Sequence, residues 1–257
     1  MVRANLAEHG FALFDSTLFA EDDCHLESAR RAFIASCDDL PPDRYSKIPG
    51  RNRRYGRFLF DTRTASIERL PPTWDRDSNE LVTYYEQQGC FNPEHAGERR
   101  AFAALTGEQS SNAFLHSLIL RCFSALPWTL EGPVVVGAHL IEFRVKSGFT
   151  VASSPSNVHC DGEPFTWAML IARDDIAGGE NIIADPDSCG KDPGEIPNRD
   201  IRARFTLEKP LQGWVVDDLK VSHYVSPVTA MSGAAVGRRI MLLVDFTPAN
   251  FNSNGVL

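Results

Sequence analysis

The chain has 257 residues, of which 43% are hydrophobic and 23% charged, a composition typical of a soluble globular protein. This length is enough for one sizeable β-barrel or sandwich domain. The net charge of −8 disfavours a nucleic-acid backbone as the main partner. No apolar run is long enough to span a membrane, and residues 1–9 lack the apolar core of a secretory signal. Neither nucleic acid nor a membrane is therefore an expected partner.

The cysteines indicate a reducing compartment. Six are spread over positions 24, 37, 90, 122, 160 and 189, and no two have C-x-x-C spacing. Thinly spread cysteines in a protein of this size are typical of reduced thiols rather than of a disulfide framework. We therefore expect a cytoplasmic location.

The first 130 residues are predicted to be rich in helices. Residues 21–37 begin with an acidic turn and end before two prolines, as expected of a helix. Residues 112–126 carry a sustained apolar stripe at helical spacing, with Asn112 as N-cap and Pro127 just past the end. The basic run at 51–57 between them is interpreted as a solvated loop.

Beyond Pro133 the sequence changes to short β-branched and aromatic runs separated by turn formers, and residues 187–200 are predicted to be a long loop. Several short strands without intervening helices predict an antiparallel sandwich or barrel. We therefore expect one α+β domain over 1–257, with a β-barrel core at about 133–248 and supporting N-terminal helices. The predicted strands are 134–146, 165–173, 181–184, 213–216, 221–228 and 239–246.

A possible metal site is the run His159-Cys160-Asp161. On an extended strand the imidazole and the carboxylate would project from the same side, because side chains alternate with period two. His223 follows 64 residues later in another strand-like run. Two imidazoles and one carboxylate form the facial triad of non-haem Fe(II) oxygenases, which leaves metal positions open. The spacing by itself is also compatible with an accidental surface pair, so its surroundings must decide.

A second possible site residue is an arginine at the start of the last predicted strand. Arg238 and Arg239 precede an apolar run, 15 and 16 residues after His223. Guanidinium suits a bidentate grip on a carboxylate, so a buried arginine here would predict a carboxylate-bearing co-substrate. The alternative is a surface ion pair at a strand end.

Substrate contacts are less well defined by the sequence. Arg54 and Tyr55 are candidates, because an α-carboxylate would favour arginine. Trp167 either lines the cavity or belongs to the core. His139 lies in an apolar strand and is expected to be a core histidine, and Cys160 is expected to point away from the metal.

Several ordered segments resemble the bacterial 2-oxoglutarate/Fe(II) dioxygenases that include the L-isoleucine hydroxylases. The sequence departs from the family pattern at Ile240, where an acidic residue is common, and at residues 156–158, where Glu-Gly is common before the metal motif. Both departures leave the substrate open. The segments that carry the resemblance are VHCDGEPF at 158–165, IARDDIAGGENII at 171–183, WVVDD at 214–218, VSHYVSP at 221–227, RRIMLLVDF at 238–246, RRYGRF at 53–58 and YEQQGCFN at 85–92.

The resemblance implies a double-stranded β-helix, or jelly-roll, barrel. It implies that His159, Asp161 and His223 bind Fe(II) and that Arg239 holds the distal carboxylate of 2-oxoglutarate. O2 would be the other co-substrate, with ascorbate a helpful addition to assays. The expected reaction is hydroxylation of an unactivated C–H bond of a free L-amino acid or related small metabolite, with release of succinate and CO2.

Two other functions remain open from the sequence. A cupin-like metal-dependent isomerase or hydrolase would generally use more histidines and would have no use for Arg239. A non-catalytic small-molecule-binding barrel would keep its function after His159→Ala. The oxidised atom, desaturation or sulfoxidation in place of hydroxylation, and the oligomeric state are also left open.

Overall fold

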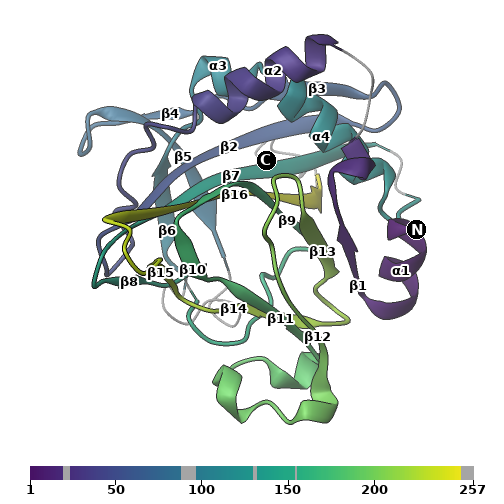
Figure 1. Cartoon of the computed structure of the whole chain (residues 1–257). Coiled ribbons are helices and arrows are strands. Elements are labelled where there is room, and N and C mark those ends of the chain that lie inside the picture. The colour runs from purple at the N-terminus through teal and green to yellow at the C-terminus, as the bar shows by residue number, and fades with distance from the viewer. Residues whose placement is uncertain (20–23, 88–96, 130–131, 154, 250–257) are drawn as a thin grey trace.

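The computed structural model describes residues 1–19, 24–87, 97–129, 132–153 and 155–249. Antiparallel strands make up most of its regular secondary structure, and the few helices gather mainly on one side of a large curved sheet (Figure 1). This arrangement agrees with the expected α+β class and is consistent with a jelly-roll fold.

The large sheet contains seven strands, and each neighbouring pair is antiparallel. Its four long strands, β9, β16, β7 and β2, lie side by side in that order. The later strands β9 and β16 are therefore neighbours, and β16 also pairs with the earlier strand β7, which pairs with β2. In spatial order the strands are β1 (Phe11–Phe14), β13 (Gly213–Asp217), β9 (Phe165–Asp174), β16 (Val236–Pro248), β7 (Pro133–Lys146), β2 (Arg51–Asp61) and β3 (Ser66–Arg69).

Three smaller sheets of three strands each complete the β structure. Two of them lie across from the large sheet, below it in Figure 1, so the described strands form two opposed layers. These two are β12 (Ile201–Thr206), β11 (Glu180–Ala184) and β14 (Ser222–Val225), and β10 (Ile176–Gly178), β15 (Val228–Ala230) and β8 (Thr150–Val151); the third is β4 (Thr73–Asp75), β5 (Glu80–Glu86) and β6 (Arg99–Ala103).

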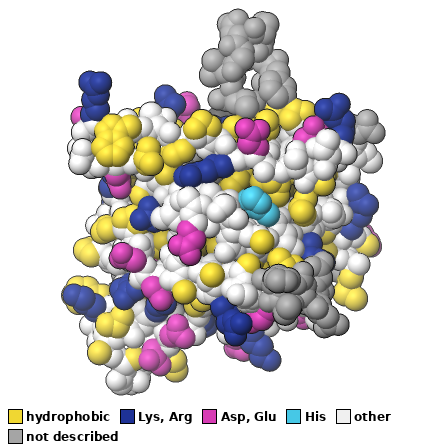
Figure 2. Space-filling model, turned by 90° about the horizontal axis from the view of Figure 1, so that it is seen from above, with side chains coloured by type: hydrophobic (Ala, Val, Ile, Leu, Met, Phe, Trp, Pro, Cys, Tyr) yellow, Lys and Arg dark blue, Asp and Glu magenta, His cyan; other side chains and the backbone are white. Residues whose placement is uncertain are grey.

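Helices cover the outer face of the large sheet, where α2 and α4 pack against each other above β2 and β7 (Figure 1). Seen from that side, acidic and basic side chains are interspersed with apolar ones, so this face has no continuous basic surface (Figure 2). The helices are α1 (Val2–His9), α2 (Cys24–Ala35), α3 (Gly107–Ser110) and α4 (Ala113–Ser124), and the 3-10 turns are η1 (Ser16–Phe19), η3 (Pro186–Ser188), η4 (Pro193–Glu195) and η5 (Asn198–Asp200).

Strand alternation gives the large sheet two different faces. On β16, Ile240 and Leu242 belong to the apolar core under the helices. Arg239 and Met241, one residue away in each case, line a cavity on the opposite face. Because side chains of a strand alternate, every long strand contributes both to the core and to the interior between the two layers.

No helix within the described ranges is both long and apolar enough to cross a membrane.

The helix with Asn112 as N-cap is confirmed, and so are the expected strands after residue 133. The predicted strand at 221–228 is two strands, β14 and β15, which belong to different sheets and are separated by Ser226 and Pro227, since proline has no N–H for a ladder. Helix α2 ends at Ala35, and residues 21–23 of its predicted span lie outside the described residues. The predicted loop at 187–200 contains short 3-10 turns.

The predictions for the first 130 residues need correction, because six strands lie there as well as the helices. The basic run at 51–57 is not a solvated loop but part of β2, which pairs along its length with β7. Arg51 on β2 is buried and forms an ion pair of 2.8 Å with Asp43. The β core therefore also includes β1 and β2 and is not confined to 133–248. The sequence did not predict this strand because its side chains that face the cavities are charged or polar, as those of an exposed loop would be.

We expect Asn112→Ala to lower the free energy of unfolding by about 1 kcal/mol, because the Asn112 carboxamide accepts hydrogen bonds from the N–H groups of Phe114 and Leu115 at the start of α4. Chemical denaturation measures this change. Asn112→Asp keeps the accepting oxygen but loses the hydrogen bond that the Asn112 amide donates to the carbonyl of Ala29, so it should retain part of the stability. Equal losses in both variants would contradict the capping role.

Candidate active site

His159 and His223 are held together by their own backbones. The N–H of His159 donates to the carbonyl of His223 at 2.9 Å, and the N–H of His223 donates back at 2.8 Å. Two residues that exchange both hydrogen bonds lie directly opposite each other in an antiparallel pair, with their side chains on the same face. The two imidazole rings are accordingly 4.4 Å apart between centroids.

Asp161 reaches the same place through a turn rather than along a regular strand. The sequence predicted an extended strand over His159–Asp161, but only His159 is paired, and the backbone turns at Gly162 with φ of 85°. The N–H of Gly162 donates to the carboxylate of Asp218 at 2.5 Å, and the side-chain amide of Gln87 donates to the carbonyl of Asp161 at 2.6 Å. These two bonds fix the backbone that carries the Asp161 carboxylate.

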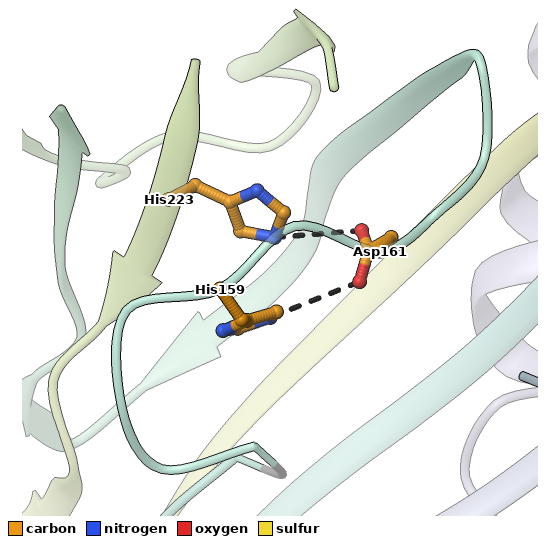
Figure 3. Close-up of side chains that lie close together, drawn as sticks. All are labelled: His159, Asp161 and His223. Atoms are coloured by element: carbon orange, nitrogen blue, oxygen red, sulfur yellow. Dashed lines mark ion pairs between the residues drawn. The ribbon is translucent and has the colours of Figure 1, made fainter. Parts of the chain in front are cut away.

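The three side chains present a compact set of ligand atoms, all within 4.8 Å of one another. Both imidazoles point toward the Asp161 carboxylate, with Nε2 of His159 3.7 Å from one oxygen and Nε2 of His223 3.4 Å from the other (Figure 3). Adjacent octahedral ligands at about 2.1 Å from an ion lie roughly 3 Å apart. The separations therefore suit a single metal ion with small adjustments.

The protonation of the triad favours metal binding. Nδ1 of His159 lies 2.9 Å from the carbonyl of Asn157, to which it can donate, and this leaves a lone pair on Nε2. Burial lowers the pKa of His223 to about 4, so its ring is neutral near pH 7. Burial opposes ionisation of Asp161, but the imidazoles of His223 and His159 outweigh it and lower the pKa of the carboxyl. Two imidazoles and a carboxylate match the donor set that divalent iron takes in facial-triad sites.

A cavity beside the triad ends at Arg239, and we call it the Arg239 cavity. The centre of a water-sized molecule can occupy about 100 Å³ of it. Arg239 is 2% exposed, and its Nε has no hydrogen-bond partner among the described residues. Burial, together with the neighbouring Arg173, lowers the pKa of Arg239 to about 10, so it remains a cation at neutral pH. The guanidinium lies over the ring of Phe143 at 5.8 Å.

Trp214 and Asn181 form a further wall of the Arg239 cavity, and sequence reasoning did not single them out. The indole of Trp214 packs against the ring of His223, with 5.0 Å between centroids. Its Nε1 donates to the side-chain oxygen of Asn181 at 3.0 Å, and both residues are buried. The indole thereby restricts the orientation of the His223 ring. The only sequence signal was their place in the motifs WVVDD and GGENII.

A second cavity, which we call the polar chamber, adjoins the Arg239 cavity at Asp161. It shares Arg53, Ile141, Asp161 and Leu243 with the Arg239 cavity. Its remaining charged and titratable residues come from separate parts of the sequence, and sequence reasoning gave them no site role. These are Tyr85, Arg100, His139, Glu163 and Asp245.

Besides Asp161, two carboxyl groups line the polar chamber in a poorly solvated setting. Burial and, after it, the negative charge of Asp161 raise the pKa of Asp245 to about 7. Burial also raises the pKa of Glu163 to about 7, and Asp245 is the next cause. Both carboxyls thus lack the solvation that would normally keep them ionised well below neutral pH.

None of the three predicted substrate contacts lines either cavity. Arg54 points to the other face of β2, where it donates to the carbonyl of Ala104 at 2.8 Å. Tyr55 is buried behind the polar chamber, with its ring stacked on that of His139 at 4.0 Å. Trp167 is fully buried in the core under the helices. The alternation of β2 instead brings Arg51 and Arg53 to the cavities.

His139 is buried and bonded, as expected of a core histidine, but it also lines the polar chamber. Cys160 faces away from both cavities, and its thiol lies 3.6 Å from the carbonyl of Val221. That agrees with the expected packed thiol.

The profile of the 2OG-Fe dioxygenase family matches residues 34–245. The protein belongs to this family. Members use Fe(II), 2-oxoglutarate and O2, for which the donor set of His159, Asp161 and His223 is suited. The family assignment makes the protein an oxidoreductase of the dioxygenase type.

Solved structures share the fold at low sequence identity. A bsmA homolog from Methylobium petroleophilum PM1 is 22% identical with a TM-score of 0.74, over 97% of this protein and 93% of that one. IDO from Bacillus thuringiensis is 18% identical with a TM-score of 0.71, over 96% and 94%. The Fe(II)/(alpha)ketoglutarate-dependent dioxygenase TqaL is 18% identical with a TM-score of 0.69, over 99% and 88%. Comparison with curated proteins found no match.

We expect His223→Ala to weaken Fe(II) binding about 100-fold or more, because even residues that only support a metal ligand typically contribute 10- to 100-fold. Anaerobic titration calorimetry measures the affinity. His116→Ala is the matched control, since this histidine lies on α4 and contacts the carbonyl of Ser110. Similar Fe(II) affinities in the His223 variant and the wild type would contradict the assignment.

Proposed function

We propose that the protein is one dioxygenase domain in which His159, Asp161 and His223 hold Fe(II). The observation that carries the proposal is the meeting of their three ligand atoms within 4.8 Å, beside a cavity that ends at a buried arginine. The family match over most of the sequence supports it. When bound, Fe(II) with 2-oxoglutarate and O2 supplies the oxidation of an unactivated C–H bond, with release of succinate and CO2.

Arg239 is proposed to hold the distal carboxylate of 2-oxoglutarate. A buried guanidinium without a counterion is costly, and a carboxylate is the anion that its two-pronged geometry fits. Among the described residues, no carboxylate forms an ion pair with Arg239. Arg238, the other sequence candidate, is already paired with Glu142 and Asp38 at 2.7 Å each. The role of the protein at this end of the cavity is to orient the co-substrate.

The proposed substrate is a free L-amino acid or a related small metabolite, hydroxylated on carbon as in the L-isoleucine hydroxylases. The cavities on either side of Asp161 are small and are lined by buried residues, which favours a small molecule over a polymer. A cytoplasmic location is proposed as well, and the four described cysteines that are free (Cys37, Cys122, Cys160 and Cys189) support it.

The test is a mass-spectrometric screen of the twenty common L-amino acids with enzyme, Fe(II), ascorbate and 2-oxoglutarate. We expect one or more to gain a single oxygen atom, with succinate formed in proportion. The His223→Ala variant should form neither product. If no succinate forms, either without an added amino acid or with any of the twenty, the proposed dioxygenase function would be overturned.

Arg239→Lys should raise the KM for 2-oxoglutarate about tenfold or more, equivalent to ~1.4 kcal/mol, because lysine keeps the charge but loses the bidentate grip. Arg238→Lys is the matched control, since its ion pairs lie outside the cavity, and its KM should stay within about twofold of the wild type. Steady-state succinate formation at varied 2-oxoglutarate gives both values. A larger effect at Arg238 than at Arg239 would reassign the anion site.

A further inference from the structure

The polar chamber carries information about the substrate that the metal triad does not. It meets the Arg239 cavity at Asp161, so a molecule bound in the chamber would lie next to the proposed metal site without occupying the end at Arg239. Two apolar residues, Ile141 and Leu243, border both cavities at this junction. Arg53 borders both cavities as well, whereas Arg100, Glu163 and Asp245 line the chamber alone.

One pole of the chamber is cationic and incompletely paired. Arg53 contacts Nδ1 of His139 at 2.6 Å, and Arg100 donates to the side-chain oxygen of Gln87 at 3.1 Å. The Nε atoms of both arginines are buried without a hydrogen-bond partner in the described part of the protein. Both guanidinium groups also lie over the ring of Phe102, at 4.0 and 5.5 Å, which holds them in place. Neither forms an ion pair with a carboxylate of the described residues.

The other pole consists of two carboxyl groups with a defined geometry. The Asp245 carboxylate accepts a hydrogen bond from the N–H of Gly137 at 3.2 Å. A Cβ at Gly137 would overlap that carboxylate, so only glycine leaves room for it. Glu163 accepts a hydrogen bond from the hydroxyl of Thr247. Both carboxyl groups line the chamber.

His139 shows how far apart the two poles are. Its Nδ1 contacts Arg53 at 2.6 Å, and its Nε2 lies 3.4 Å from Asp245. One imidazole and two polar contacts therefore span the distance from the guanidinium to the carboxylate. The head of an α-amino acid, with ammonium and carboxylate on one carbon, has a similar width and can bridge the same poles in the chamber beside His139.

We propose that Arg53 and Arg100 bind the substrate carboxylate, that Asp245 and Glu163 bind its ammonium group, and that Ile141 and Leu243 face an apolar substituent directed toward the triad. This inference rests on the proposed function and adds to it the residues that determine specificity. Charge-assisted hydrogen bonds to both ends would hold one C–H bond of that substituent near the metal. An amine or a carboxylic acid alone would leave one buried pole unpaired, which is costly.

The experiment measures binding, not turnover. Wild-type enzyme is loaded with Fe(II) and 2-oxoglutarate without oxygen and titrated calorimetrically with L-valine, L-leucine, L-isoleucine and L-methionine. For each that binds, the matching amine and acid are titrated too, which for L-leucine are 3-methylbutylamine and 4-methylpentanoic acid. We expect at least one amino acid to bind, and both of its analogues to bind at least tenfold more weakly.

Substitutions at each pole test which pole binds the carboxylate of the amino acid and which binds its ammonium group. Arg53→Gln should weaken binding of the amino acid at least tenfold but leave binding of the amine unchanged, because the amine lacks the group that Arg53 contacts. Asp245→Asn should weaken the amino acid equally and leave the acid unchanged. Glu163→Gln repeats the second test at a less buried position, in case Asp245→Asn does not fold. The exposed Arg63→Gln is the matched control and should bind as the wild type does.

The outcomes separate this inference from the proposed function. Failure of the wild type to bind 2-oxoglutarate with Fe(II) would overturn both. Normal 2-oxoglutarate binding with no amino acid bound, with analogues as tight as the amino acid, or with unchanged affinity in the folded variants would overturn the chamber assignment alone. A purely structural ion network predicts lower melting temperatures in the variants but not the dependence on which charged end is present.

Discussion

The two backbone hydrogen bonds between His159 and His223 are the constraint on which the site depends. They join the segment before β9 to β14, which in turn pairs with β11, so the smaller sheet carries both imidazoles. Because these hydrogen bonds are made by the backbone, the distance between the two imidazole rings does not depend on any single contact between side chains. Asp161 is positioned differently, by the turn at Gly162, whose N–H donates to the carboxylate of Asp218. A strand pair and an anchored turn together bring the three proposed ligands to one point.

The opposite wall of the site comes from the register of the large sheet. In β16 and β7, Arg239 pairs with Phe143, Met241 with Ile141, and Asp245 with Gly137. The side chains of Arg239, Phe143, Met241, Ile141 and Asp245 line the interior, while residues that alternate with them belong to the core under the helices, namely Ile240, Leu242, Val244, Leu140 and Ala138. A shift of register by one residue would exchange the two sets, so the apolar core also fixes the positions of the functional side chains.

The buried charged and polar groups between the two layers make the protein less stable than an apolar core at the same place would. Arginine nitrogens at positions 53, 100 and 239 are buried without partners among the described residues. Asp245 and Glu163 are carboxyl groups whose ionisation burial disfavours. Such unpaired groups are destabilising unless a ligand pairs with them, and proteins retain them mainly at functional sites. Binding of charged small molecules would then stabilise the fold as well as orient the reacting bond.

Elements with strong local signals could be predicted from the residues alone. The cap at Asn112, the apolar stripe of α4 and the β-rich region after Pro133 all follow from nearest-neighbour patterns. These features are local or repeat with the period of one element, so the sequence is enough to find them. The site residues His159, Asp161, His223 and Arg239 were instead indicated by the resemblance to a family, because their spacing alone is also compatible with chance.

The remaining features depend on how distant segments pair. The charged residues of β2 led to the prediction of a loop, but they belong to a strand whose polar face is buried. The regular strand predicted at His159–Asp161 is a single β-bridge at His159 followed by a turn. The polar chamber draws on residues from β2, β6, β7 and β16 and from the loop before β9, and no spacing in the sequence connects them. The reason is physical: long-range pairing and register decide which face of a strand meets the cavity, and a one-residue change reverses that choice.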